Sequence, residues 1–292
     1  MNGPELQLAR VEGARLLRNP AVWLSLSFTV IWARQVDPAA SPEDVYFLLS
    51  GFSLVLPGFV MLAIIVLAAL RSRSSGADAL LDTVPVGPDR RSIAHGLSAL
   101  AGAIAGVVVI AAGYVRFRPG PVIGRTVDTI PVGVQVPRPN LAQLLQGPLA
   151  VVVFCALGLA LVRWIPTWLV VVPTLVAFLY QFTIWGIWSG TTVSALNWWL
   201  PISSGVVAGE WVGCSSRSPV CLLEHGGFDQ TTPWWHLTYL IALAAVLVAV
   251  ALLRHRRDRA AWTFFGVSLA AVAGLAVAQA IVYQQYTPLN GG

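Results

Sequence analysis

The chain has 292 residues, of which 57% are hydrophobic and 11% are charged, whereas about a quarter of residues are charged in a typical soluble domain. Its 18 basic residues are all arginine, so it lacks the lysine that a Walker A phosphate loop or a Schiff-base cofactor requires. The net charge of +5 comes from arginines at the ends of apolar runs, which argues against nucleic-acid binding. These features predict a membrane protein whose energy source, if it is ATP, binds elsewhere.

Apolar runs recur along the whole chain, and most approach the roughly 20 residues that a helix needs to cross a membrane. A single cleaved signal peptide cannot account for this distribution. An amphipathic segment at residues 5–19 precedes the first run and is expected to lie on the membrane surface. We predict an all-α polytopic membrane protein with six to seven transmembrane helices, an N-terminal interfacial helix and two large outer loops. The predicted spans are residues 20–33, 47–70, 92–114, 144–162, 168–188, 235–253 and 261–283, with a kink expected at Pro57-Gly58.

The arginines predict how the chain is oriented. With the N-terminus in the cytoplasm, twelve arginines fall on the inner side and six on the outer side, as the positive-inside rule favours. Residues 71–91 then form a cytoplasmic loop, residues 115–142 and 189–234 form the outer loops, and the extra span at 261–283 places the C-terminus outside. The composition, rich in arginine, alanine, valine and glycine, is typical of a high-GC bacterium, so we expect a bacterial cell membrane.

The cysteines agree with this orientation. Cys214 and Cys221 share the second outer loop, where an oxidising compartment would permit a disulfide that closes a small ring. The alternative is a pair of unpaired thiols. Cys155 lies within a predicted span and is expected to serve ordinary packing.

The predicted spans contain few side chains that could serve in ion transport, metal binding or catalysis. Their middles lack Asp, Glu, Arg and Lys, which argues against an ion-coupled carrier because such carriers need an ionisable relay in the membrane. His95 and His236 lie near opposite faces and are too far apart to share a haem or a metal ion. Hydrolase and metalloprotease motifs are absent, and no metal site is predicted. The outer loop carries side chains that could in principle assemble a hydrolytic or metal site, but they lack a recognised ligand spacing. They are Glu210, Arg217, Glu224, His225 and Asp229.

The segment between the second and third spans has a pattern of its own. A capping box that includes Asp78 predicts a short helix over residues 76–82, which ends before Pro85. Asp89 can cap the next helix, and the two arginines that follow it anchor the third span at the inner interface. The expected product is a compact helix and turn on the cytoplasmic face, joined stiffly to two spans. Such an element can transmit a displacement of a soluble partner to the helices in the membrane.

The motif in this segment consists of Gly76, Leu80-Leu81, Thr83-Val84-Pro85-Val86 and Arg90-Arg91. It resembles the first coupling loop of type-2 ABC exporter permeases. The 5–19 helix is similar to the interfacial connecting helix of that family, the link at 163–167 falls at its second cytoplasmic contact, and the resemblance covers roughly residues 5–254. The chain departs from the family in its seventh span and in carrying Arg71 and Arg73 where many members have a glutamate.

The resemblance implies a subunit that is not itself an enzyme. ATP and Mg would be bound by a separate cytoplasmic ABC ATPase, and this chain would need no cofactor or metal of its own. A second permease, identical or a sister chain, would complete a homodimer or a heterodimer among membrane lipids. The residues expected to couple the permease to the ATPase are Gly76, Asp78, Leu81, Asp82, Pro85, Asp89, Arg90 and Arg91.

Tryptophans gather near the outer ends of the fifth and sixth predicted spans. Interfacial anchoring is one interpretation. The other is an outer vestibule through which a hydrophobic or amphipathic molecule leaves, formed by Trp188, Trp198, Trp199 and Trp211. Two further functions stay open for the chain: a non-transporting scaffold or sensor whose outer loop binds a ligand or partner, and a membrane enzyme that acts on lipid or cell-wall precursors.

Overall fold

The computed structural model of the protein describes its helices and short parts of their connections. Every regular element in the described residues is helical, so the predicted all-α class is confirmed. The described residues are 4–36, 45, 48–49, 52–74, 88–118, 139–165, 167–188, 201 and 232–286.

The helices follow the predicted apolar runs in chain order. A short 3-10 helix, η1 (Phe52–Leu54), precedes α4, and another, η2 (Trp168–Val170), precedes α8. The α-helices are α1 (Pro4–Arg18), α2 (Pro20–Gln35), α4 (Val55–Ser74), α6 (Pro88–Phe117), α7 (Leu141–Trp164), α8 (Val171–Trp188), α12 (Thr232–Leu253) and α13 (Arg259–Tyr286).

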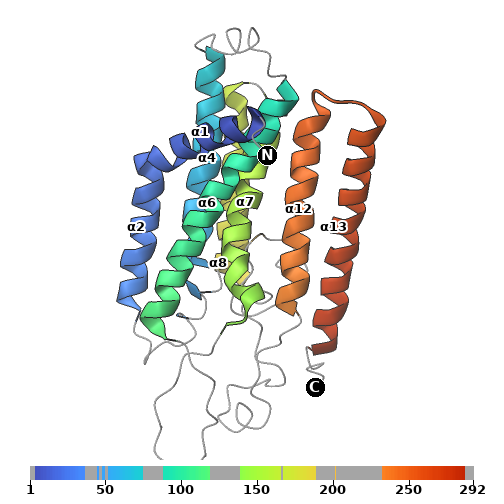
Figure 1. Cartoon of the computed structure of the whole chain (residues 1–292). Coiled ribbons are helices and arrows are strands. Elements are labelled where there is room, and N and C mark those ends of the chain that lie inside the picture. The colour runs from blue at the N-terminus through green and yellow to red at the C-terminus, as the bar shows by residue number, and fades with distance from the viewer. Residues whose placement is uncertain are drawn as a thin grey trace, which may run out of the picture.

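The bundle is built around α7, and α1 lies across one of its ends (Figure 1). Helices α4, α6 and α12 all contact α7, and α12 also packs along α13. In the most apolar stretch of α7, 72% of the residues are buried, against 11% in α13. The core therefore surrounds α7, whereas α13 is peripheral and exposes most of its apolar surface.

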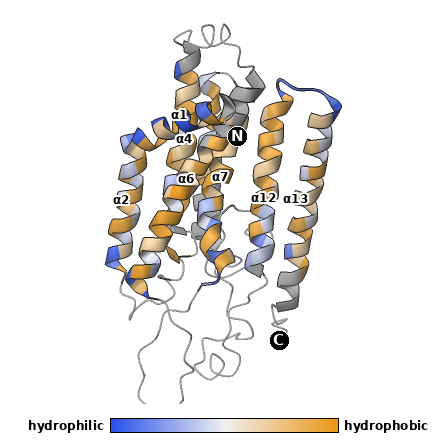
Figure 2. Ribbon diagram, in the orientation of Figure 1, coloured by the Kyte–Doolittle hydropathy of each residue, from blue (hydrophilic) through white to orange (hydrophobic). Residues whose placement is uncertain are grey.

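Four described helices are long and apolar enough to cross a membrane: Ala99–Phe117, Leu141–Trp164, Pro233–Leu253 and Arg259–Ile281. They correspond to the third, fourth, sixth and seventh predicted spans. Two shorter apolar helices, Val55–Arg71 and Trp168–Tyr180, correspond to the second and fifth. Figure 2 shows hydrophobic residues along the middle of the helices and polar residues at their ends, as expected for helices surrounded by lipid.

Two helices, α4 and α6, begin at residues other than the predicted ones. Pro57 lies in the first turn of α4, where its missing N–H breaks no helical hydrogen bond, so the helix begins at the place where a kink was expected. Helix α6 begins at Pro88, earlier than the predicted span. The end of the predicted coupling loop, with Asp89, is therefore helical.

Glycines allow the central helices to approach one another closely. A Cβ atom at Gly58 of α4 would overlap the ring of Phe154 on α7, and one at Gly102 of α6 would overlap the Met61 side chain of α4. The Phe154 ring also packs against Phe59, with the two ring centroids 4.3 Å apart. Because a larger residue would force these contacts apart, the glycines help to set the spacing around α7.

Candidate functional site at the arginine-rich end

One end of the bundle gathers most of the arginines, and we call it the arginine-rich end. It comprises α1, the end of α4, the start of α6, the end of α7 and the α12–α13 connection (Figure 1). Among the described residues, only Arg34, Arg116 and Arg118 belong to segments at the opposite end. The described arginines thus divide between the two ends as predicted. Those at the arginine-rich end are Arg10, Arg15, Arg18, Arg71, Arg73, Arg90, Arg91, Arg163, Arg254, Arg256, Arg257 and Arg259.

Helix α1 is amphipathic and turns its small and apolar side toward the bundle. Ala9, Gly13 and Leu16 are buried, and this spacing of four and three residues places them on one helical face. Leu16 joins the hydrophobic core beside Val22 of α2, and α1 packs extensively against α6. The sequence predicted an amphipathic helix here; its contact with α6 depends on the tertiary structure.

The corner between α1 and α2 is held by specific hydrogen bonds. The Asn19 side chain accepts a hydrogen bond from the Ala21 backbone N–H at 3.0 Å and so caps α2. Pro20 follows at the first helical position, which suits its fixed φ angle. The Trp23 indole N–H reaches back across the corner and donates to the Leu17 carbonyl. These contacts favour a firm junction through which a displacement of α1 would reach α2.

The same end of α7 is joined to α12. The Trp164 indole N–H donates to the Val250 carbonyl at 2.8 Å, and the Arg254 guanidinium lies 5.8 Å from the centroid of the Trp164 ring. A cation over the face of an indole ring is attracted by the ring quadrupole. The two helices are thus linked where they reach the arginine-rich end.

The α12–α13 connection carries an acidic cap. Asp258 Oδ1 accepts the Ala261 backbone N–H at 2.8 Å at the start of α13, and Arg256 donates to Asp258 Oδ2 at 2.8 Å. The hydrogen bond from Ala261, followed by the one from Arg256, lowers the pKa of the Asp258 carboxyl below its ordinary value. The carboxylate is therefore ionised at neutral pH.

The predicted coupling residues are described in part. Asp89, Arg90 and Arg91 lie in the first turn of α6, at the arginine-rich end. Gly76, Asp78, Leu81, Asp82 and Pro85 lie outside the described residues.

The predicted outer features lie mostly outside the described residues too. Trp188 is the last residue of α8, at the opposite end from α1, so the structure does not bring it near the described coupling residues. Cys214, Cys221, Trp198, Trp199 and Trp211 fall in the undescribed part, and their disulfide and vestibule roles stay predictions. Cys155 is a buried free thiol in the core, as expected of a packing residue.

Sequence reasoning missed buried polar side chains in α7, α12 and α13, three of which take part in contacts between helices. Gln143, Gln146, His236 and Gln279 are all buried. Gln146 Nε2 donates to the Pro233 carbonyl at 3.2 Å, and His236 Nδ1 lies 2.9 Å from Gln279 Oε1. The available signal was the occurrence of glutamine within long apolar runs, because a buried amide needs a partner. Among the described residues, no cluster of His, Cys, Asp or Glu could hold a metal ion.

Comparison of the chain with protein-family models, with the sequences of curated proteins and with solved structures gives no match. The fold and composition define its class: it is a membrane protein whose described elements are all helical, with four helices long and apolar enough to span a bilayer.

Proposed function

We propose that this chain is the membrane-spanning permease subunit of an ATP-driven ABC exporter whose ATPase is a separate polypeptide. The observation that carries the proposal is the packing of α1 against α6 at the arginine-rich end. Helix α1 covers the segment that resembles the interfacial connecting helix of type-2 permeases. Helix α6 begins with the last residues of the segment that resembles their first coupling loop. Through this contact, a displacement of the helix that leaves the coupling loop would reach the surface helix.

The arginine-rich end faces the cytoplasm in this proposal, because positive residues are retained there. The ATPase then docks at this end through residues 76–91 and binds ATP and Mg itself. The opposite end, with the outer loops and the C-terminus, lies outside the cell. A second permease, identical or a sister chain, completes the translocation path.

Coupling follows from the contacts of α6. The ATPase closes when it binds nucleotide and displaces the first turn of α6, where Arg90 lies. Because α6 packs against both α1 and α7, the displacement reaches the surface helix and the core helix together. The nucleotide shifts the permease between two conformations only to the extent that the ATPase binds them with different affinity. The uncharged middles of the spans favour a hydrophobic or amphipathic cargo that moves outward.

The proposal is tested by purifying the detergent-solubilised chain from its native membrane and identifying the proteins that accompany it by mass spectrometry. We expect an ATPase subunit to copurify with the wild type and to be lost from the double variant Asp82→Arg plus Arg90→Glu. The matched control is Arg257→Glu, which reverses an exposed charge at the same end but on the α12–α13 connection. This control should retain the ATPase.

The copurification results distinguish the exporter proposal from the scaffold or sensor alternative. Loss of the ATPase from the double variant but not from Arg257→Glu supports residues 76–91 as the coupling segment. Equal loss from Arg257→Glu would reduce the interaction to general charge attraction and contradict the assigned segment. If no ATPase accompanies the wild type, the exporter proposal fails and the scaffold or sensor function takes its place.

A further inference from the structure

A cavity of about 220 Å³ lies between α2 and α6, at the end of the bundle opposite the arginine-rich end. Its walls are the last turns of both helices, and residues from the segment before α4 close it on the protein side. Leu48, Leu49 and Ser53 are buried, whereas Val30 and Ala112 at the rim are exposed. The cavity therefore opens sideways between two helices, toward the space that lipid occupies around a membrane protein.

The cavity is lined mainly by hydrocarbon. Its two hydroxyl groups are already engaged: Thr29 Oγ1 donates to the Ser53 carbonyl at 2.8 Å, and Ser53 Oγ donates to the Leu48 carbonyl at 2.8 Å. Their hydrogens are therefore committed to the protein backbone. The remaining donors among the lining side chains are the guanidinium groups of Arg34 and Arg116.

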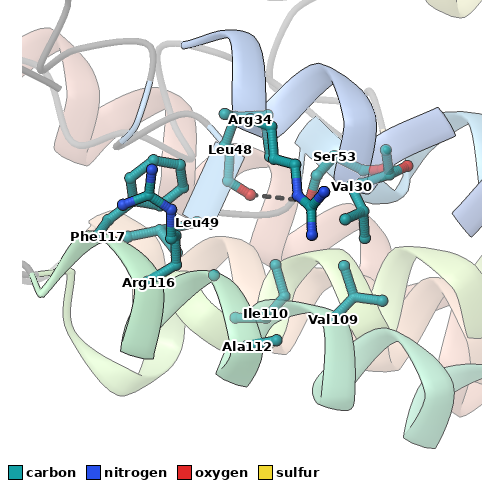
Figure 3. Close-up of a pocket in the computed structure, with 13 residues that line it drawn as sticks. Val30, Arg34, Leu48, Leu49, Ser53, Val109, Ile110, Ala112, Arg116 and Phe117 are labelled. Carbon is teal, nitrogen blue, oxygen red and sulfur yellow. Dashed lines mark hydrogen bonds between the residues drawn. The ribbon is translucent and has the colours of Figure 1, made fainter. Parts of the chain in front are cut away.

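The two arginines add positive charge to this apolar cavity. Figure 3 shows the Arg34 side chain extending from α2 toward Val109 and Ile110 of α6. The Arg116 guanidinium lies 5.9 Å from the centroid of the Phe117 ring. No carboxylate in the described part of the chain forms an ion pair with Arg34 or Arg116. The helix dipole favours a cation at each helix C-terminus, but it does not account for an apolar cavity beneath the charge.

We propose that this cavity binds an anionic phospholipid. A segment of acyl chain lies against Val30, Leu49, Val109 and Ile110, and the lipid phosphate pairs with Arg34. The planar guanidinium presents a fork of N–H donors that matches a phosphate group. Arg116 adds a second positive charge at the same rim.

The size and lining of the cavity favour a lipid over a free anion. The cavity is smaller than the roughly 300–1,000 Å³ of ordinary small-molecule sites, so it holds part of a ligand whose remainder stays in the bilayer. A hydrated inorganic phosphate would gain nothing from the aliphatic walls, and burying it against them would cost desolvation. An amphiphile uses the walls and the charge together.

The test measures lipid binding to the purified full chain by native mass spectrometry. The protein is incubated in mixed micelles that contain equal amounts of phosphatidylglycerol and phosphatidylcholine with the same acyl chains. We expect the wild type to retain phosphatidylglycerol in preference to phosphatidylcholine. Arg34→Gln should lower that preference about fivefold, the effect of removing one basic contact to an anionic lipid. This readout is independent of any ATPase.

Two further variants make the result specific. Arg118→Gln removes an arginine at the same end that does not line the cavity, and it should leave the preference unchanged. Ala112→Phe keeps both charges but fills the cavity, and it should lower retention of phosphatidylglycerol. Excess inorganic phosphate should not displace the lipid. The proposal is overturned if Arg34→Gln matches the wild type, if Arg118→Gln has an equal effect, if Ala112→Phe retains lipid normally, or if inorganic phosphate competes.

Discussion

His236 and Gln279 are fully buried among apolar helices. Gln279 Nε2 donates to the Leu275 carbonyl at 3.3 Å, which leaves Gln279 Oε1 to accept from His236 Nδ1 across 2.9 Å. His236 therefore carries its proton on Nδ1 in this arrangement. The bond joins α12 to α13, the peripheral helix. Hydrogen bonds between transmembrane helices contribute roughly 0.6–2 kcal/mol.

At the residue scale we predict that Gln279→Leu lowers the free energy of unfolding by about 1–2 kcal/mol, because it removes the partner of a buried imidazole. Denaturant unfolding in detergent micelles measures the effect. Val277→Leu, at an exposed position of the same helix, should leave stability unchanged. In a double-mutant cycle with His236→Leu, the second substitution should cost less than it does alone. Strictly additive effects would show that the two side chains are not coupled.

The α12–α13 connection is a short polar segment that joins two long apolar helices. Its Asp258 carboxylate caps α13 and holds Arg256. Because the pKa of Asp258 is lowered in the folded chain, its contribution to stability is fully present above the ordinary pKa of an aspartate. That contribution is lost as the pH falls through the lowered folded-state pKa.

At the scale of this element we predict that Asp258→Ala speeds amide hydrogen exchange at Ala261, because the capping acceptor is gone. Asp258→Asn should retain most of the protection, since an asparagine oxygen still accepts the hydrogen bond. The protection factor in the wild type should fall at acidic pH, whereas that of Asp258→Asn should be insensitive to pH over the same range. Equal exchange in all three proteins would mean that the side chain does not cap α13.

The described arginines are concentrated at one end of the helix bundle, so the two ends differ in charge. The proposed coupling site and the proposed lipid site lie at opposite ends. One depends on α1 and the start of α6, and the other depends on the far ends of α2 and α6. A result that contradicts one therefore leaves the other standing.

At the scale of the molecule we predict its orientation by cysteine labelling. In a background with Cys155→Ala, Cys214→Ser and Cys221→Ser, a single cysteine replaces either Arg118 or Arg257. A membrane-impermeant maleimide added to intact cells should label Arg118→Cys directly. It should label Arg257→Cys only after the cells are permeabilised, because arginine-rich segments stay in the cytoplasm. The reverse pattern would place the arginine-rich end outside and contradict the proposed docking of a cytoplasmic ATPase.

Much of the candidate site was readable from local sequence. The amphipathic pattern of residues 5–19 predicted α1. Asp89 was expected to cap the next helix, but α6 begins at Pro88, so Asp89 lies within its first turn. The buried glutamines were not predicted, because an apolar run gives no indication of which neighbour will pair with Gln279. The Arg34 cavity was missed for the same reason, since its walls come from segments far apart in the chain.

The sequence by itself determined the all-helical membrane class, the approximate positions of the helices and the separation of the arginines. These properties depend on hydropathy and charge along the chain, which local sequence carries. Only the tertiary structure decided that α7 is the core helix, that α1 packs on α6, and that His236 meets Gln279. Each of these depends on which helices become neighbours. Lipid tails are as apolar as the helices themselves, so hydrophobicity does not select the neighbours in a membrane. Close packing and interhelical hydrogen bonds select them instead.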